Sequence, residues 1–263
     1  ITQPVIVDGY TQTGGQVNTL PVGNNAIIKI RIDGISAGIV ARGLILNPLT
    51  GNSRISGLSI TRFDNGIVIE PMAGGGNQIS GNFIGLMPDG DTTSGNRCSG
   101  VLLRGSNNQV GGTAPADRNL ISGNGCDAGV GVVDTSATAN QVLGNYIGTD
   151  RTGLLDRGNT SNGISIAQGA SGNSVGGATA GHRNVLSGNN GFGVRIVDSN
   201  TANNLVLGNF IGVGANGSTA VGNNGFGIIV NGGSGVSGNV IGGVAPGQGN
   251  VIANNGFRGV VVD

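Results

Sequence analysis

The sequence predicts an all-β chain, a right-handed parallel β-helix (β-solenoid) with three short strands per coil and about eight coils. Two repeated motifs carry this prediction. The pentapeptide Gly-Asn-Phe/Tyr-Ile-Gly occurs at residues 81–85, 144–148 and 208–212, and a second, Asn-led motif starts at Asn119, Asn184 and Asn250. A long period that holds two related units is typical of a solenoid, in which each coil buries its apolar face against the next. Because parallel crossovers are right-handed in nearly all cases, the hand is predicted too.

Three strand signatures follow one another in each coil. The first is a glycine followed by alternating apolar residues, and its copies start at Gly66, Gly100, Gly129, Gly163, Gly193, Gly227 and Gly259. The second is led by asparagine, at Asn77, Asn108, Asn140, Asn173, Asn204 and Asn239. The third is the short apolar pair inside the two repeated motifs. Two or three apolar residues that alternate with small or polar ones indicate a half-buried strand.

The corners between strands are predicted at Gly-Asn pairs. Glycine makes up 55 of the 263 residues, and every coil needs corners with positive φ, which glycine adopts most easily. Such pairs stand at residues 81–82, 123–124, 144–145, 188–189 and 208–209. Equivalent asparagines of stacked coils are expected to hydrogen-bond along the rod.

Domain organisation follows from the repeats. Residues 66–263 form regular coils that alternate between a longer loop (85–99, 148–162, 212–226) and a shorter one (111–118, 176–183, 242–249). Residues 1–65 are less regular, with strands predicted at 5–7, 26–32, 44–46 and 54–60. We interpret residues 1–263 as one β-helix domain that is part of a longer chain. Neither end shows a capping helix, and unpaired strand edges invite end-to-end self-association.

Composition excludes several classes of function. Lys plus Arg and Asp plus Glu number 13 each, aromatic residues make up 3%, and tryptophan is absent. With no net charge and no basic stripe, the chain is not expected to bind nucleic acid. No apolar run approaches the length of a membrane span, so no membrane insertion is expected.

The two cysteines occupy the same loop in adjacent coils. Cys98 lies two residues before Gly100, and Cys126 lies three residues before Gly129. Stacked strands are about 4.8 Å apart, and disulfides need Cα atoms roughly 4.4 to 6.8 Å apart. A disulfide is therefore predicted, which would indicate an oxidising compartment; two unlinked thiols are the alternative.

Three blocks carry a resemblance to a known family: residues 144–153, 173–177 and 184–189. They resemble the right-handed parallel β-helix repeats of large bacterial surface and secreted proteins, over about residues 60 to 263. This implies a pectate-lyase-like architecture in an extracellular or cell-surface protein. The repeated residues are corners and core positions, so the resemblance implies the fold and not an activity.

Catalytic residues of related carbohydrate-active β-helices are expected on the outward face of one sheet. The outward row of the first strand signature holds no carboxylate: Val68, Leu102, Gly131, Ser165, Arg195, Ile229 and Val261. The far edge of this sheet is more polar, with Glu70, Arg104, Asp134, Gln168, Asp198, Asn231 and Asp263 expected in successive coils. If the protein is an enzyme, Asp134, Arg195 and Asp198 are the predicted catalytic residues. Solvated turn residues are the favoured alternative.

Other chemistry has weaker support. Asp89, Asp91 and Asp150 place oxygens in the longer loops, and Ca²⁺ needs six to eight oxygen ligands. These three residues are therefore candidate Ca²⁺ ligands, although no cofactor is expected. The single histidine, His182, takes the place of Asp117 and Gln248 in the other short loops, which favours a surface role.

The sequence thus predicts an extracellular structural or adhesive module that presents a binding surface to a polysaccharide or a cell-surface glycan. The alternative is a polysaccharide lyase, epimerase or glycoside hydrolase that acts on an extended polysaccharide.

Overall fold

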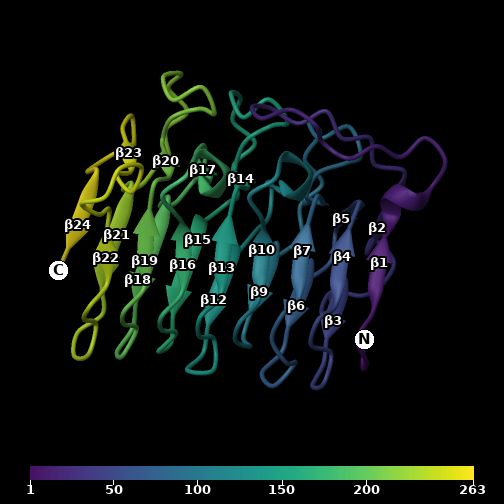
Figure 1. The fold of residues 1–263 in the computed structure, drawn as a ribbon, viewed down its shortest axis with the longest axis horizontal. Coiled ribbons are helices and arrows are strands. Elements are labelled where there is room, and N and C mark those ends of the chain that lie inside the picture. The colour runs from purple at the N-terminus through teal and green to yellow at the C-terminus, as the bar shows by residue number, and fades with distance from the viewer.

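Three parallel sheets of eight strands each run side by side along the molecule in the computed structural model, which describes residues 1–263 (Figure 1). Consecutive strands of the chain lie in different sheets, so each coil visits all three sheets once. The predicted right-handed parallel β-helix with eight coils is confirmed.

The strands are short, and each sheet is assembled from every third one. The first sheet contains β1 (Ile6–Asp8), β4 (Arg54–Ser56), β7 (Gln78–Ser80), β10 (Gln109–Gly111), β13 (Gln141–Leu143), β16 (Ser174–Gly176), β19 (Leu205–Leu207) and β22 (Val240–Ile241). The second contains β2 (Ile30–Asp33), β5 (Leu58–Thr61), β8 (Phe83–Ile84), β11 (Leu120–Ile121), β14 (Tyr146–Ile147), β17 (Val185–Leu186), β20 (Phe210–Ile211) and β23 (Val251–Ile252). The third contains β3 (Leu44–Leu46), β6 (Ile67–Ile69), β9 (Val101–Leu103), β12 (Ala128–Val133), β15 (Asn162–Ala167), β18 (Val194–Val197), β21 (Ile228–Asn231) and β24 (Val260–Val262).

Helical structure is limited to three single 3₁₀ turns, η1 (Gly9–Thr11), η2 (Pro115–Asp117) and η3 (Ala180–His182). None of them has the length or the apolar character of a membrane-crossing helix.

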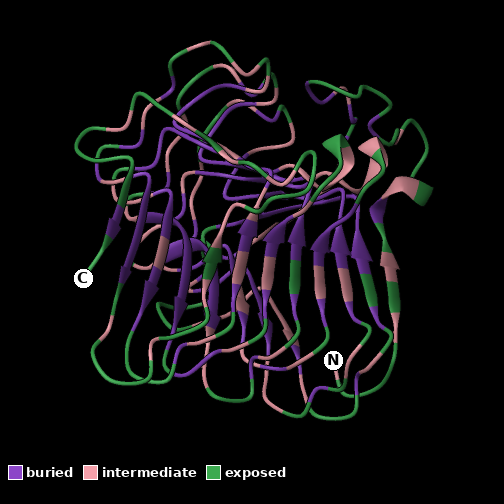
Figure 2. Ribbon diagram, turned by 60° about the vertical axis from the view of Figure 1, so that its left-hand side comes forward, coloured by how far each residue is buried: buried purple, intermediate pink, exposed green.

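The core is a column of inward-facing apolar side chains, 30 of which, all aliphatic except Phe63, form one buried cluster. Figure 2 shows buried residues along most strands and exposed residues mainly at the turns. In the third sheet, for example, Val130, Ile164, Val194 and Ile228 stack in register. Each coil contributes only a few apolar side chains, so a coil buries its apolar face fully only when it lies between two neighbours.

Three columns of six asparagines each line the corners of the coils. The columns are Asn77, Asn108, Asn140, Asn173, Asn204 and Asn239; Asn82, Asn119, Asn145, Asn184, Asn209 and Asn250; and Asn96, Asn124, Asn159, Asn189, Asn223 and Asn255. In every column the side-chain amide donates to the side-chain oxygen of the asparagine in the next coil. The predicted asparagine ladder is confirmed and extends to a third corner.

Each amide inside a column is fully hydrogen-bonded. Asn119 Nδ2 donates to Asn145 Oδ1 at 2.9 Å and to the Ile79 carbonyl at 2.9 Å. Its Oδ1 accepts from both the backbone and the side-chain nitrogen of Asn82. The glycine before many of these residues has positive φ, +69° at Gly144 for example. Because buried polar groups are costly when unpaired, this arrangement explains why asparagine recurs at buried corners.

The first 65 residues differ from their predicted strands in two places. The strand predicted at 26–32 begins only at Ile30, and the strand predicted at 54–60 is two strands, β4 and β5. Gly57 separates β4 from β5 with φ +73°, which turns the chain from the first sheet into the second.

Residues 12–29 form a long excursion that we call the finger. It leaves the coil after η1, runs along the outside of the rod toward β14 and returns to β2 (Figure 1). Gln16 and Ile27 pair across it in an antiparallel bridge. At its tip the Gly23 backbone nitrogen donates to the hydroxyl of Tyr146 at 2.9 Å. The finger therefore connects the first coil with a coil more than 100 residues later in the sequence.

The predicted disulfide is confirmed. Cys98 and Cys126 are bonded, their Cα atoms are 4.4 Å apart, and no free cysteine remains.

Candidate functional site

The outward row of the third sheet has the predicted register. Its members pair in sequence from Val68 to Val261. Leu102 and Arg195 are half-buried, and the other five members are buried although they lie outside the 30-residue core cluster. Arg195 lies over Ser165, and its Nη1 donates to the Ser165 hydroxyl at 3.5 Å. The row therefore exposes little side-chain surface to a ligand.

Asp134, Gln168 and Asp198 each lie one residue beyond the predicted row of Glu70, Arg104, Asn231 and Asp263, and the three are level with one another. Leu103 pairs with Val132, so Arg104 is level with Val133 and not with Asp134. Arg104 reaches Asp134 nonetheless, with Nη2 to Oδ2 at 2.8 Å, and it also bonds Glu70 at 3.1 Å. Glu70 in turn pairs with Arg42. Asp134 is thus the last member of a chain of four ion-paired side chains along the edge of the sheet.

Arg195 and Asp198 share a different location. Both line a hollow of about 510 Å³ at the end of β18 and β21, together with Val197, Ser199, Ile229, Asn231 and Gly232. Asp198 is exposed and sits in the left-handed region, with φ +68°. Its Oδ2 accepts from the backbone nitrogen of Gln168 at 3.2 Å. The structure therefore brings Arg195 and Asp198 together in one hollow that does not include Asp134.

The candidate Ca²⁺ ligands act within their own loops. Asp89 caps a turn, because its Oδ1 accepts from the backbone nitrogens of Asp91 and Thr92 at 2.8 Å each. Burial raises the pKa of Asp89, but the hydrogen bonds from Thr92 and Asp91 outweigh it and hold that pKa below its ordinary value. Asp150 likewise accepts from Leu154 N at 3.1 Å and from Thr152 Oγ1. No three His, Cys, Asp or Glu side chains come together anywhere in the chain.

His182, Asp117 and Gln248 occupy equivalent positions in the three short loops. Asp117 accepts from the Ala114 nitrogen, Gln248 accepts from the Ala245 nitrogen, and His182 contacts the Thr179 hydroxyl. In each case the side chain bonds the residue three positions earlier. The shared geometry explains why three different polar residues suit this place.

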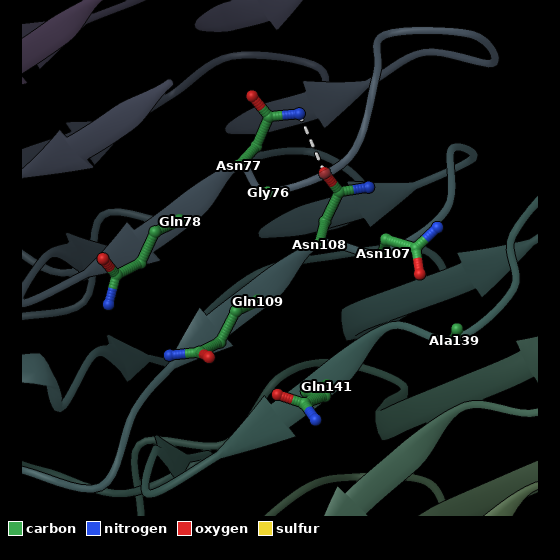
Figure 3. Close-up of a pocket in the computed structure, with 8 residues that line it drawn as sticks. All are labelled: Gly76, Asn77, Gln78, Asn107, Asn108, Gln109, Ala139 and Gln141. Carbon is green, nitrogen blue, oxygen red and sulfur yellow. Dashed lines mark hydrogen bonds between the residues drawn. The ribbon is translucent and has the colours of Figure 1, made fainter. Parts of the chain in front are cut away.

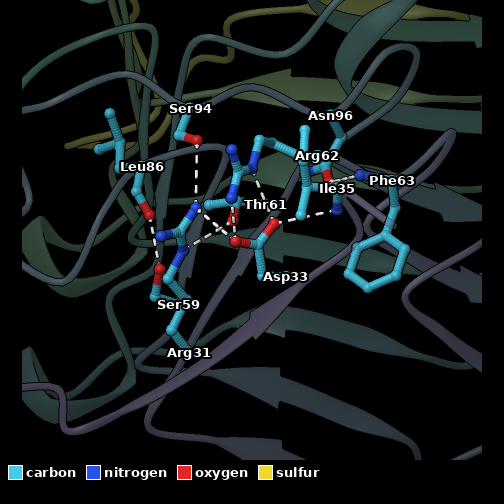
Figure 4. Close-up of polar contacts among 10 residues, drawn as sticks. All are labelled: Arg31, Asp33, Ile35, Ser59, Thr61, Arg62, Phe63, Leu86, Ser94 and Asn96. Carbon is cyan, nitrogen blue, oxygen red and sulfur yellow. Dashed lines mark hydrogen bonds and ion pairs between the residues drawn. The ribbon is translucent and has the colours of Figure 1, made fainter. Parts of the chain in front are cut away.

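Another charged cluster surrounds Asp33 near the start of the rod (Figure 4). Arg62 Nε donates to Asp33 at 2.7 Å and Arg31 Nη2 lies 3.0 Å from it, while Arg31 Nε also bonds Thr61. The hydrogen bond from Arg62 holds the pKa of Asp33 below its ordinary value, and it raises the pKa of Arg62. With its carboxylate committed to two arginines, Asp33 is a structural ion pair and not a free acid or base.

A hollow of neutral amides lies on the outer face of the first sheet. It encloses about 380 Å³ and is lined by Gly76, Asn77, Gln78, Asn107, Asn108, Gln109, Ala139 and Gln141. Gln78, Gln109 and Gln141 follow one another in strand register, and no hydrogen bond joins them to one another (Figure 3). Gln109 donates to its own strand at Gly111 O. The three glutamines therefore present side-chain donors and acceptors to solvent at intervals of about one strand spacing, roughly 4.8 Å.

The amide hollow was not predicted from the sequence. A signal was present, since Gln78, Gln109 and Gln141 each follow a column asparagine, as the pair Asn-Gln. The Asn-Gln pairs indicate strand starts, and a strand start alone does not predict a binding surface.

Comparison with known protein families and with curated proteins finds no match for this chain. The three parallel sheets agree with the architecture that the sequence resemblance implied, but no family match supports membership of that particular family. Function is therefore inferred from the residues and their geometry.

Proposed function

We propose that the protein is an extracellular structural module that binds a neutral glycan along the amide hollow of its first sheet. The single observation that carries this proposal is the row Gln78, Gln109 and Gln141 in a hollow that no charged side chain lines. Each glutamine amide offers two donors and an acceptor, which suits sugar hydroxyls that also donate and accept. The eight residues that line the hollow include no charged side chain.

The rod itself supports a binding role. Its three asparagine columns and continuous core hold neighbouring strands in fixed register, so the glutamines are presented at regular intervals without reorganisation. A rigid, preorganised surface loses less entropy on binding. The disulfide supports an oxidising compartment. End-to-end self-association stays a prediction, which sedimentation at increasing protein concentration would test.

The enzyme alternative has less support. Hydrolysis needs two carboxyl groups about 5 to 9.5 Å apart across the scissile bond, and the hollow beside Arg195 contains a single carboxylate, that of Asp198. Asp134 is ion-paired with Arg104 instead.

The decisive experiment is titration of the protein with a panel of neutral and acidic oligosaccharides, with binding followed by calorimetry. We expect a neutral oligosaccharide to bind, and Gln78→Ala and Gln141→Ala each to weaken binding about 2- to 10-fold, since a net hydrogen bond contributes about 0.5 to 1.5 kcal/mol. Gln12→Ala, at an exposed glutamine outside the hollow, is the matched control. Equal affinities for all variants would place the site elsewhere.

The same samples test the alternative. Reducing ends and unsaturated products are followed after incubation with each polysaccharide. Turnover that disappears in Asp134→Asn or Asp198→Asn would favour the enzyme over the binding module, whereas binding without turnover supports the proposal.

A further inference from the structure

An apolar column runs along the outer face of the second sheet. Its members pair in strand register: Phe83, Leu120, Tyr146, Val185, Phe210 and Val251. The finger covers the first part of this column, where Ala26 and Ile28 belong to the same buried cluster as Phe83 and Leu120. Phe210 is half-buried and Val251 is exposed, so the later part of the column has less cover.

The finger tip is held by Arg118 and Tyr146. The Arg118 guanidinium lies over the Tyr146 ring, 4.5 Å from its centroid. Its terminal nitrogens donate to the carbonyls of Leu20 (3.0 Å), Pro21 (2.9 Å) and Gly23 (2.5 Å). Burial lowers the pKa of Arg118, but Coulombic interaction with Tyr146 acts in the opposite direction. This pair is a clamp that recognises the carbonyl groups of an extended, uncharged chain segment.

The next repeat contains a second copy of the clamp. Arg183 lies over the Phe210 ring at 4.3 Å, as Arg118 lies over Tyr146. Arg183 uses Nε to donate to the Gly208 carbonyl at 3.1 Å, which leaves both terminal nitrogens available. A cavity of about 80 Å³ reaches from the finger tip at Val22 to this copy, and its walls include Val185 and Ala215. The second clamp is therefore continuous with a site at which a polypeptide segment is already seated.

The two clamps differ in two contacts. Tyr146 accepts a hydrogen bond from Gly23 N, and Phe210 has no hydroxyl for this purpose. Arg151 donates to the Asn24 carbonyl at 2.9 Å, and the equivalent position in the next long loop is Ala215. The second copy keeps the stacked arginine and the apolar floor but offers fewer polar contacts, so it should bind more weakly than the first.

We propose that Arg183 and Phe210 form a docking site for an extended, uncharged segment of a partner protein, with the chemistry of the finger tip. The carbonyl groups of the segment face Arg183, and an apolar side chain packs on Val185 and Ala215 beside Val22. This site lies on the second sheet and is separate from the amide hollow of the first sheet, so either proposal stands or fails without the other.

The test uses the intact protein and a fluorescent peptide with the sequence of residues 17–26, the finger tip. We expect saturable binding by anisotropy that is at least about tenfold weaker in Arg183→Ala, since charged hydrogen bonds are lost. Phe210→Tyr restores the missing hydroxyl and should tighten binding several-fold without disturbing the fold. Arg258→Ala, at an exposed arginine that does not line the cavity of the second clamp, is the matched control and should bind like the parent protein.

Two results with the finger-tip peptide would overturn the proposal. They are the absence of saturable binding to both the parent protein and Phe210→Tyr, and equal affinity in Arg183→Ala. If the peptide also fails to bind Arg118→Ala while it binds Arg183→Ala fully, it displaces the finger rather than occupying the second clamp. A scrambled peptide that binds as well would argue equally against recognition of the segment.

Discussion

The corner columns and the outer faces of the same coils follow opposite rules. Each corner repeats one residue, asparagine, through six successive coils. The outer column of the first sheet changes from Arg54 through Gln78, Gln109 and Gln141 to Ser174 and Leu205. A corner residue must satisfy the backbone of two neighbouring coils, whereas an outer residue meets solvent. Repetition therefore determines the fold, and departures from repetition determine what each face can bind.

The largest loss of stability should follow removal of one asparagine from a column. Asn145→Ala removes an amide that bonds Asn119, Asn184 and two backbone carbonyls. The neighbouring groups stay buried without partners, which costs about 1 to 3 kcal/mol for each unpaired group. We expect the free energy of unfolding to fall by about 3 kcal/mol or more, as measured by urea denaturation.

Asn224→Ala is the control for this prediction. Asn224 is exposed and bonds only the side chain of Asn190 through its amide, so its loss should change stability by no more than about 0.5 kcal/mol. Similar effects for both variants would contradict the distinction between columns and outer surface.

Loss of the disulfide should cause the next largest loss of stability. The disulfide lies outside the columns and acts by constraining the unfolded chain. Cys98 and Cys126 close a loop with a sequence separation of 28, for which the chain-entropy model gives about 3 kcal/mol. Cys98→Ser with Cys126→Ser should lower the denaturation midpoint accordingly, and added reductant should then have no further effect. A reductant-independent midpoint in the parent protein would refute this account.

Release of the finger should have a smaller effect on the stability of the whole protein, because the change is confined to residues 12–29. Arg118→Ala removes three hydrogen bonds to the finger tip, and charged hydrogen bonds contribute about 1.5 to 3 kcal/mol. We expect faster amide exchange and faster proteolysis in residues 12–29, with unchanged exchange in the asparagine columns. Arg157→Ala, which removes a contact between two long loops, should leave the finger protected. Global loss of protection in Arg118→Ala would show that the finger is part of the cooperative core.

The smallest expected effect is on the pH dependence of stability. The pKa of Asp33 is lower in the folded protein than its ordinary value because Arg62 donates to it. Its contribution to stability is therefore present above the unfolded pKa of about 3.9 and is lost as the pH falls through the lower, folded value. The ion pair faces solvent, which screens it, so the contribution should be small. Asp33→Asn and Arg62→Gln should both flatten the stability profile below about pH 4; a profile like that of the parent would refute the assignment.

The sequence predicted the coil, the register of the outward row of the third sheet and the disulfide because each depends on spacing along a regular repeat. It missed the finger because residues 12–29 contain no repeated motif. Their backbone carbonyl groups bond Arg118, and such contacts leave no signature in the sequence because every residue has a carbonyl group. It predicted corners at Asn124 and Asn189 but missed the alternate members of their column, Asn96, Asn159 and Asn223, since those asparagines lie inside long loops of varied sequence.

The candidate site shows the same limit. Arg195 and Asp198 share a hollow as their spacing along one strand suggests, but Asp134 does not join them. Asp134 and Asp198 are level with each other but lie two coils apart, and Asp134 bonds Arg104 of the preceding coil. Repeat spacing places these side chains along one edge, but it does not show which neighbour each of them bonds.

The columns also make the length of the rod an adjustable quantity. Every asparagine in a column donates its side-chain hydrogen bond to the asparagine of the following coil. Any two coils of the same kind therefore offer the same interface to the coil that follows. Removal of the 64 residues 148–211 would join Ile147 to Gly212, which occupies the place of Gly148 in its own coil. The disulfide and the finger contacts of Arg118 and Tyr146 would remain, whereas the contact of Arg151 with Asn24 would be lost, because Ala215 would take its place. Evolution or an engineer can therefore set how far apart the ends of this molecule stand by gain or loss of whole pairs of coils, without redesign of a single contact type.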